Sequence, residues 1–263
     1  MASDRSNSAE ATPEQESTAG GPLRKAVLVI SGSLILTIGS LVMLVTAVLT
    51  LFQTRRFCAE RIARTMGYLA VRCSGVRMVV HRDAPLPNTQ TVYISNHTST
   101  LDVFVTTALG LPNTRYFLSG FLRKILPLGL IGYLIGVFWT APLRFPEKRR
   151  KIFQRADRIL RRTGESVYLT PEGARIRTGE IGHFNRGAFH LATSLGVDIV
   201  PIYIHIAKQT GAGLNLVSGP GRVDVYFLPT ISTAGWSVDE LDQNRDRVRK
   251  RYVEFHAQLQ ADR

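Results

Sequence analysis

Cysteine is almost absent from this 263-residue chain, in which Cys58 and Cys73 are the only two thiols. Two cysteines are too few for a disulfide scaffold, and no cluster of Cys and His has the spacing of a zinc site. We therefore expect reduced thiols and no metal. Aromatic residues make up only 8% of the chain and no nucleic-acid-binding motif occurs, which argues against stacking platforms for bases.

Acidic residues are also in the minority, with 20 Asp and Glu against 33 Lys and Arg, so the net charge is +13. Such an excess predicts an anionic partner, which is a nucleic acid, a phospholipid surface or a phosphorylated substrate. Because no nucleic-acid motif accompanies the charge, we expect an anionic phospholipid membrane and no nucleic acid. The length allows one large domain or two small ones, with a substantial core.

Charge is missing altogether from residues 26–52, a run of 27 residues. This run is longer than a signal-peptide core, and as a helix it would extend about 40 Å, enough to cross a bilayer. We predict a membrane anchor over residues 23–53, either one span or a hairpin that turns at its Gly-Ser positions. The preceding residues 1–22 are small and polar, which predicts a disordered tail.

Four basic residues follow the charge-free run within residues 55–64, whereas two, Arg24 and Lys25, lie directly before it. Positive residues favour the cytoplasmic side, so this bias places the rest of the chain on the cytoplasmic face of the cell membrane. Over residues 54–75 basic positions alternate with apolar ones, among them Phe57, Met66 and Leu69. That spacing predicts a basic amphipathic connector on the anionic surface, with a solvated linker helix as the alternative.

Short apolar runs alternate with helical patterns over residues 76–263, which predicts an α/β domain with a mixed sheet flanked by helices. Strands are expected at 76–81, 91–95, 136–140, 166–170, 198–204 and 223–228, and helices near 100–110, 147–163, 186–195 and 239–260. The charge-free run 125–143 is interrupted by Pro and Gly, which favours a membrane-facing helix followed by a core strand over a second membrane span.

The first polar motif is "YISNHTSTLDVF", where a strand runs into His97 and Asp102. In one continuous helix these two residues would lie about 500° apart around the axis, so they meet only if the chain turns between them. The intervening Thr and Ser residues favour a helix start, which predicts a strand-to-helix corner. Asp102 would then accept the Nδ1 proton of His97 and leave Nε2 as a base. Alternatively, "STLD" is a capping box and His97 an ordinary loop residue.

The second motif is "PEGARIR", which directly follows the predicted strand at 166–170. Loops at strand ends carry ligands in α/β proteins, and Gly173 would allow the backbone to approach a bound group. Arg175 and Arg177 can offer planar forks to phosphate oxygens. A solvated loop is the alternative.

"NHTSTLD", "PEGAR", "FNRGAF" and "VPIYI", in this order, resemble the glycerolipid acyltransferase family, whose best-known members are the lysophosphatidate acyltransferases. The resemblance covers about residues 75–230. It implies transfer of a fatty acyl chain from acyl-CoA or acyl carrier protein to a lysolipid hydroxyl at a membrane, without a bound cofactor. Two alternatives are an O-acyltransferase for another lysolipid, such as a lyso-ornithine lipid, and a non-catalytic protein that binds anionic membranes or nucleic acid.

By this resemblance, His97 and Asp102 match the catalytic pair of the family, and Glu172, Gly173 and Arg175 match its acceptor-phosphate motif. Backbone amides near Gly173 are then candidate donors to the oxyanion of the tetrahedral intermediate.

Other positions are implied by the resemblance alone. Ala174 stands where the family usually has threonine, whereas Arg177, Phe184, Gly187 and Pro201 fit the family pattern. The family also has an arginine six residues after a glycine. After Gly136 that position is Pro142, and the nearest candidate for the acceptor site is Arg144, two residues further on.

Overall fold

The computed structural model describes residues 22–176, 178–206 and 221–261, so all of the predicted tail except its last residue lies outside it. Seven strands form one sheet in the order β1-β7-β6-β2-β5-β3-β4. All neighbours are parallel except β6 and β7, which confirms the predicted mixed sheet. The strands are β1 (Val76–His81), β2 (Val92–Ser95), β3 (Thr114–Ser119), β4 (Phe138–Thr140), β5 (Ser166–Leu169), β6 (Ile199–Ile206) and β7 (Gly221–Phe227).

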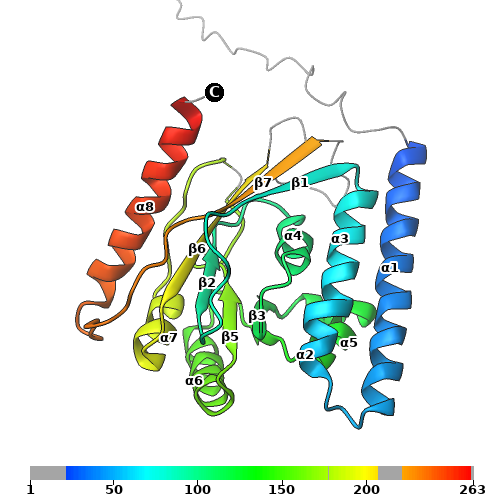
Figure 1. Cartoon of the computed structure of the whole chain (residues 1–263), viewed down its shortest axis with the longest axis horizontal. Helices are drawn as coiled ribbons and strands as arrows, with labels where there is room; N and C mark the ends of the chain where they lie inside the picture. The colour runs from blue at the N-terminus through cyan, green and yellow to red at the C-terminus, as the bar shows by residue number, and fades with distance from the viewer. Residues whose placement is uncertain (1–21, 177, 207–220, 262–263) are drawn as a thin grey trace, which may run out of the picture.

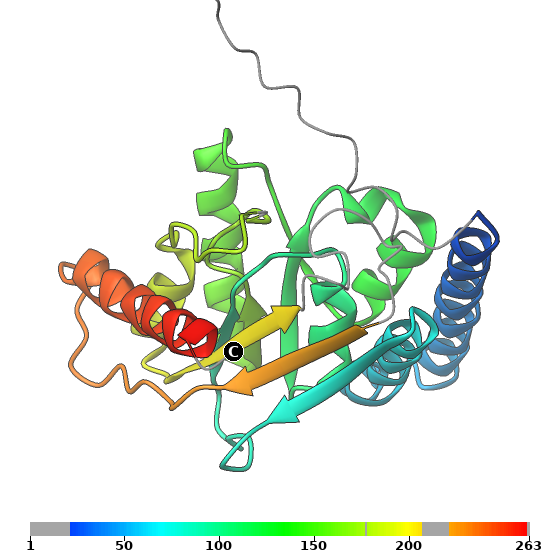
Figure 2. The ribbon, with the colours of Figure 1, turned by 90° about the horizontal axis from the view of Figure 1, so that it is seen from above.

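Helices cover both faces of this sheet (Figures 1 and 2). One buried cluster joins the sheet to α1, α3, α4 and α5, and a second joins its other face to α6, α7 and α8. The helical elements are α1 (Pro22–Leu49), α2 (Arg55–Phe57), η1 (Cys58–Ala63), α3 (Arg64–Cys73), α4 (Asp102–Ala108), η2 (Leu122–Lys124), α5 (Leu126–Leu134), α6 (Pro146–Thr163), α7 (Gly187–Leu195) and α8 (Leu241–Ala261).

Strand β3 is the element that the sequence pattern missed. Arg115 lies near its start, and a charged residue in an apolar run argues against a buried strand. In the structure Arg115 is buried, because its Nε donates to Oε2 of Glu165 at 2.6 Å. Oε1 of the same carboxylate accepts from Arg55 at 2.5 Å, so this ion bridge also ties the segment after α1 to the start of β5. Paired charges of this kind are tolerated inside proteins.

Helix α1 is continuous from Pro22 to Leu49, so the alternative of a hairpin is wrong. It is long and apolar enough to cross a membrane by length and composition, and it is the only such helix in the described part of the chain. It packs against α3 and α5. Gly39 makes this possible, because a Cβ there would lie 2.3 Å from the sulfur of Met66 on α3. Most of α1 nevertheless stays exposed.

The connector is helical from Arg55 to Cys73, with a π-helical stretch over η1. Part of its apolar side packs against the domain, because Cys58, Ala63 and Met66 are buried. At Gly67 a Cβ would come within 2.7 Å of a backbone oxygen of α4, so α3 and α4 approach closely. The connector is therefore wedged between α1 and α4, and only part of its apolar stripe, such as Leu69, remains exposed.

Residues 125–143 form helix α5 followed by strand β4, which confirms the predicted helix and core strand. Three large apolar side chains are exposed here: Phe121 directly before η2, and Leu126 and Tyr133 on α5. With the exposed apolar side chains of the adjoining α1, they form what we call the apolar face.

Strands β1 and β7 are joined by a cluster of charged side chains. Asp224 is buried on β7 and accepts from Nε2 of His81 at 2.7 Å and from Arg222 at 2.6 Å. Burial alone would raise the pKa of Asp224, but these hydrogen bonds outweigh it and hold the pKa below its usual value of 3.8. The cluster therefore stabilises the fold when Asp224 is ionised.

Candidate active site

The corner predicted between β2 and α4 is present in the structure. Strand β2 ends at Ser95, and α4 begins at Asp102. The buried side chain of Asn96 fixes the point where the chain leaves the sheet, since its amide donates to the carbonyl of Ile204 at 2.9 Å and accepts from the same residue's N–H at 2.8 Å. The following residue, His97, is thereby held at the carboxyl end of the central strands.

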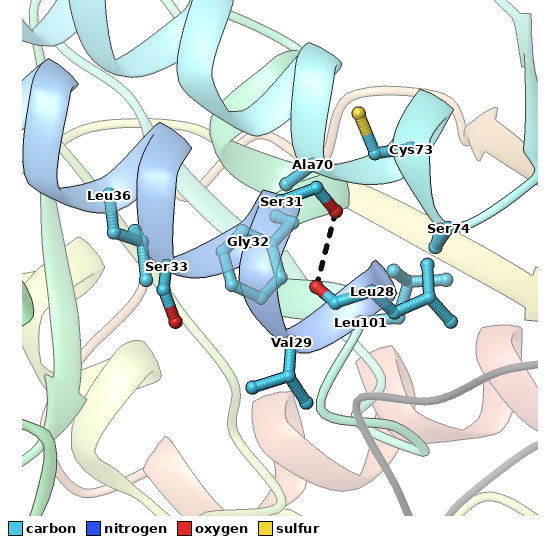
Figure 3. Close-up of a pocket in the computed structure, with 11 residues that line it drawn as sticks. Leu28, Val29, Ser31, Gly32, Ser33, Leu36, Ala70, Cys73, Ser74 and Leu101 are labelled. Atoms are coloured by element: carbon cyan, nitrogen blue, oxygen red, sulfur yellow. Dashed lines mark hydrogen bonds between the residues drawn. The ribbon is translucent and has the colours of Figure 1, made fainter. Parts of the chain in front are cut away.

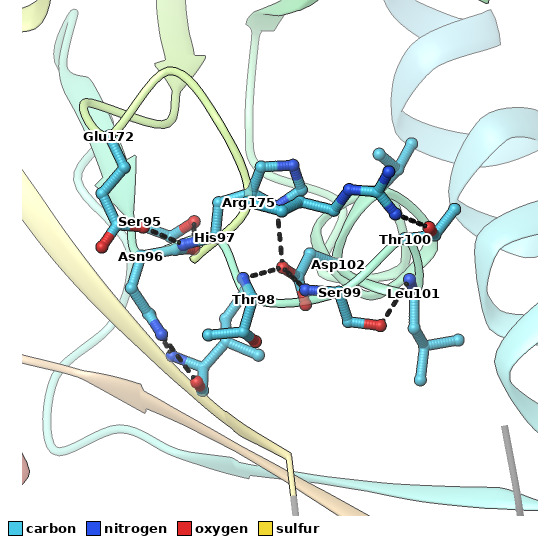
Figure 4. A network of polar contacts seen from close by, with 12 residues as sticks. Ser95, Asn96, His97, Thr98, Ser99, Thr100, Leu101, Asp102, Glu172 and Arg175 are labelled. Carbon is cyan, nitrogen blue, oxygen red and sulfur yellow. Dashed lines mark hydrogen bonds and ion pairs between the residues drawn. The ribbon is translucent and has the colours of Figure 1, made fainter. Parts of the chain in front are cut away.

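His97 and Asp102 meet across this corner, as Figure 4 shows. The distance from Nδ1 of His97 to Oδ2 of Asp102 is 2.8 Å. Asp102 is 1% exposed, whereas the imidazole keeps 20% of its side-chain surface. Within the described residues Nε2 of His97 has no hydrogen-bond partner. The pair thus has the geometry of a base whose tautomer is set by a buried carboxylate.

The capping alternative is also present in the same carboxylate. Oδ2 of Asp102 accepts from the backbone N–H groups of Thr98 and Ser99, at 2.8 and 2.9 Å. The hydroxyl of Ser99 in turn accepts from the N–H of Leu101 at 3.1 Å, so Ser99 and Asp102 hold the turn before α4, although the N-cap residue Leu101 has no side-chain cap bond. Asp102 therefore holds the turn that leads into α4 and orients His97 at the same time.

Glu172, predicted as a substrate-binding residue, is buried and braces His97. Its Oε2 accepts from the N–H of His97 at 2.5 Å and its Oε1 from the N–H of Gly182 at 2.8 Å. The carbonyl of His97 accepts from the N–H of Ile176 at 2.8 Å. Burial raises the pKa of the Glu172 carboxyl, against the effect of these hydrogen bonds. Each oxygen accepts one backbone N–H, so the carboxylate holds backbone in place on both sides of the loop.

Gly173 adopts a φ of 68°, which favours glycine, and it is exposed beside Glu172. The loop is fastened by Asn185, a residue that the motif analysis did not single out. Its Nδ2 donates to the carbonyls of Pro171 and Glu172, at 2.9 and 3.0 Å. An Asn after "GHF" carries no sequence signal of this role, because the role depends on a loop 13 residues earlier.

The arginines are placed differently. Arg175 is exposed and donates from Nη1 to the hydroxyl of Thr100 at 2.5 Å, so it reaches the corner that carries His97. Arg144 is exposed as well, and its guanidinium lies 5.1 Å from the ring centre of Phe145. The loop of Arg144 passes close to Gly173, since a Cβ added to Gly173 would lie 3.7 Å from the side chain of Leu143. Arg177 lies outside the described residues.

The remaining motif residues are parts of the core. Phe184 is fully buried with its ring edge-on to Tyr252, and Pro201 pairs with Ile94 inside the sheet. A Cβ on Gly187 would lie 2.5 Å from the ring of Phe153, so this glycine lets α7 approach α6. No group of three or more potential metal ligands occurs among the described residues.

An apolar pocket of about 150 Å³ lies between α1, α3 and the start of α4 (Figure 3). Leu28 and Leu36 of α1 line it on one side, and Leu101 and Phe104 line it on the other. The hydroxyl of Ser31 is turned back to the carbonyl of Leu28 at 3.2 Å, so it adds little polarity. Since Leu101 precedes Asp102, the pocket shares a wall with the corner that carries His97.

Several known proteins are similar to this chain in sequence or in fold. The family model described as "Acyltransferase" matches residues 77–205. A mouse 1-acyl-sn-glycerol-3-phosphate acyltransferase alpha is 29% identical over 72% of this chain and 66% of its own length. A Pseudomonas aeruginosa 1-acyl-sn-glycerol-3-phosphate acyltransferase is 25% identical over 79% of this chain and 81% of its own.

A third relative, the chloroplast 1-acyl-sn-glycerol-3-phosphate acyltransferase LPAT1 of Arabidopsis thaliana, is 35% identical over 45% of this chain. The matched stretch spans about a third of that relative (32%). The crystal structure of the 1-acyl-sn-glycerophosphate acyltransferase PlsC from Thermotoga maritima superposes with a TM-score of 0.69 at 19% identity, over 88% of this chain and 97% of that one, which shows a shared fold. The family model and these relatives agree with the order of the motifs, and residues 77–205 of the chain match the acyltransferase family.

Proposed function

We propose that the protein transfers a fatty acyl chain from a thioester donor, acyl-CoA or acyl carrier protein, to the free hydroxyl of lysophosphatidate and so forms phosphatidate. The observation that carries the proposal is the 2.8 Å contact between His97 and Asp102, with Arg175 bonded to Thr100 in the same corner. A protein that merely binds anions needs an arginine but no oriented histidine, so this pair argues against the non-catalytic alternative.

His97 acts as the general base. Its free Nε2 takes the proton of the acceptor hydroxyl while that oxygen attacks the thioester carbonyl. The tetrahedral intermediate collapses by breaking its C–S bond, and the imidazolium returns the proton to the leaving thiolate. Asp102 keeps the Nδ1 proton in place and stabilises the imidazolium between these steps. The substrate supplies the nucleophile, so no serine or cysteine of the chain is needed.

The oxyanion of the intermediate needs donors. The N–H of Gly173 is occupied, because it donates to the carbonyl of Thr170 at 3.2 Å. The next two backbone N–H groups, of Ala174 and Arg175, have no partner within the described residues. We assign them as the candidate oxyanion donors, which shifts this role one residue along the loop from Gly173.

Arg175 holds the acceptor phosphate in this proposal. It is exposed and its guanidinium can pair with a phosphate through two parallel hydrogen bonds. The same contact would aim the acceptor hydroxyl at His97, so part of the binding energy is used to orient the reacting group. Arg144, on the loop beside Gly173, is the second candidate for this site.

The setting is a membrane surface. Exposed apolar side chains gather on α1 and α5, and the apolar pocket between α1 and Leu101 is suited to a lipid chain next to the corner. The excess of positive charge after α1 favours the cytoplasmic face.

A panel of lysolipids, assayed with the purified protein and both thioester donors, tests the proposal. We expect lysophosphatidate to be the preferred acceptor. Turnover of a phosphate-free lysolipid, such as a lyso-ornithine lipid, without turnover of lysophosphatidate would contradict the acceptor and the role of Arg175. Absence of turnover with every acceptor and donor would contradict acyl transfer itself.

A further inference from the structure

Helix α6 carries a row of basic side chains on one side. Lys151, Arg155, Arg158 and Arg162 follow one another at i, i+4, i+7 and i+11 and are all exposed. At about 100° per residue these four positions fall within a strip of about 60° on the helix surface, and the strip is about 17 Å long. We call these four residues the α6 stripe.

In the described part of the chain the stripe has no acidic partners. Within the described residues none of its four side chains makes a hydrogen bond or an ion pair. The two acids of α6 are used beside it, because Glu147 pairs with Arg150 at 2.6 Å and Asp157 with Arg161 at 3.6 Å. Like charges four residues apart disfavour a helix. A row of unpaired cations is therefore a surface on which an anionic partner gains hydrogen bonds and ion pairs without displacing any.

The position of the stripe argues for a protein partner rather than a membrane. Ala156 and Leu160 of α6 belong to the buried cluster shared with α7 and α8, whereas α1 and α5 belong to the cluster on the opposite face of the sheet. Figure 2 shows α1 and the α7–α8 side of the molecule on opposite sides of the strands. None of the exposed large apolar side chains of the described residues lies within α6. Helices that bind at a membrane surface combine basic residues with such side chains.

The stripe begins close to the proposed site. Leu143, three residues before α6, lies against Gly173, and the ring of Phe153 lies against Gly187. Because α6 leads from the carboxyl edge of the sheet to the start of β5, its first turns are the ones nearest the loop of Arg175. A partner lying along α6 would thus reach that loop with one of its ends.

We propose that the α6 stripe docks an acidic carrier protein that presents the acyl thioester, an inference that rests on the proposed acyl transfer. Opposite charges on the two surfaces steer the carrier to α6 and fix its orientation, and this attraction is weakened by salt. Acyl-CoA has no such protein surface and does not need the stripe.

The test uses the full chain and two double variants. Arg155→Gln/Arg158→Gln removes two charges from the stripe. The matched control is Arg247→Gln/Arg251→Gln on α8, which removes two exposed and unpaired charges of the same kind from another helix. KM and kcat are measured for a carrier-protein thioester and for acyl-CoA, at low and at moderate salt.

We expect the stripe variant to raise KM for the carrier-protein thioester roughly 2- to 30-fold, as the loss of two surface charge contacts predicts. Its kcat and its KM for acyl-CoA should stay at the wild-type values, and the salt dependence of KM for the carrier should become shallower. The control variant should match the wild type with both donors.

Three results would overturn the inference while leaving the proposed function intact. They are an equal rise in KM for both donors, no change with either donor, and a loss of binding to phosphatidylglycerol vesicles without a donor-specific effect, which would make the stripe a membrane contact. Wild-type turnover with acyl-CoA but none with the carrier thioester would also overturn this inference alone. No turnover with either donor would overturn both.

Discussion

Replacing Glu172 by Gln tests whether the buried carboxylate braces the catalytic corner. Both oxygens accept backbone N–H groups, from His97 and from Gly182. A glutamine offers one oxygen and one NH₂, so one of these N–H groups would face a donor. Losing a hydrogen bond to a charged group costs about 1.5–3 kcal/mol, and a buried unpaired N–H costs about 1–3 kcal/mol.

Part of this loss is offset. Burial raises the pKa of Glu172, which means that the ionised carboxylate is itself costly in this position, and a neutral amide avoids that cost. We therefore expect a net loss near 2 kcal/mol, which for a chain of this size lowers Tm by about 4–8 °C. Without the bond from Glu172 to its N–H, His97 can move, and a displacement of about 1 Å would lower kcat by about 10²-fold.

Thermal unfolding followed by intrinsic fluorescence, and thiol release from acyl-CoA, measure the two effects. Glu180→Gln is the matched control, because Glu180 lies in the same loop, is exposed and makes no side-chain hydrogen bond within the described residues. It should keep the wild-type Tm and turnover. If Glu172→Gln behaved like this control in both assays, the bracing role would be refuted.

Other variants test the corner, the acceptor contact and the strand cluster. His97→Ala should lower kcat by about 10²–10⁴-fold without changing Tm, whereas Asp102→Asn should lower both, since its carboxylate also holds the turn before α4; retained turnover of either variant by acyl-CoA assay would contradict the base assignment. Arg175→Ala should raise KM for lysophosphatidate, with partial recovery in Arg175→Lys, and Thr100→Val should raise it less; an unchanged KM in all three would remove the arginine from the acceptor site. Asp224→Asn should lower Tm at neutral pH, and this difference should shrink as pH falls below 3.8 and the wild-type carboxyl protonates; a difference independent of pH in thermal melts would contradict the ionised cluster.

The sequence predicted the fold well where one pattern dominated. The helices and most strands follow apolar periodicity, which depends on neighbours in the chain. Strand β3 escaped because Arg115 interrupts the pattern, and its partner Glu165 lies 50 residues away. The placement of the connector escaped for a similar reason, since glycines such as Gly67 reveal close helix packing only when the opposite helix is known.

In the site, geometry within one short segment was easier to predict from sequence than contacts between distant segments. A turn between His97 and Asp102 could be inferred from five residues of sequence and the known pitch of a helix. The brace from Glu172, the anchor at Asn185 and the contact between Arg175 and Thr100 join segments that are 10 or more positions apart. No spacing within one segment encodes such contacts, and both partners are common surface residue types.

The double use of the Asp102 carboxylate bears on how diverged copies of this domain should be interpreted. Because Oδ2 receives two backbone N–H groups as well as the imidazole, a copy that no longer performs chemistry would still need the aspartate to hold the turn before its helix. The ring of His97 makes no such contact with the backbone within the described residues. An intact aspartate at this corner is therefore expected in active and inactive copies alike, whereas loss of the histidine would mark a copy without the proposed base.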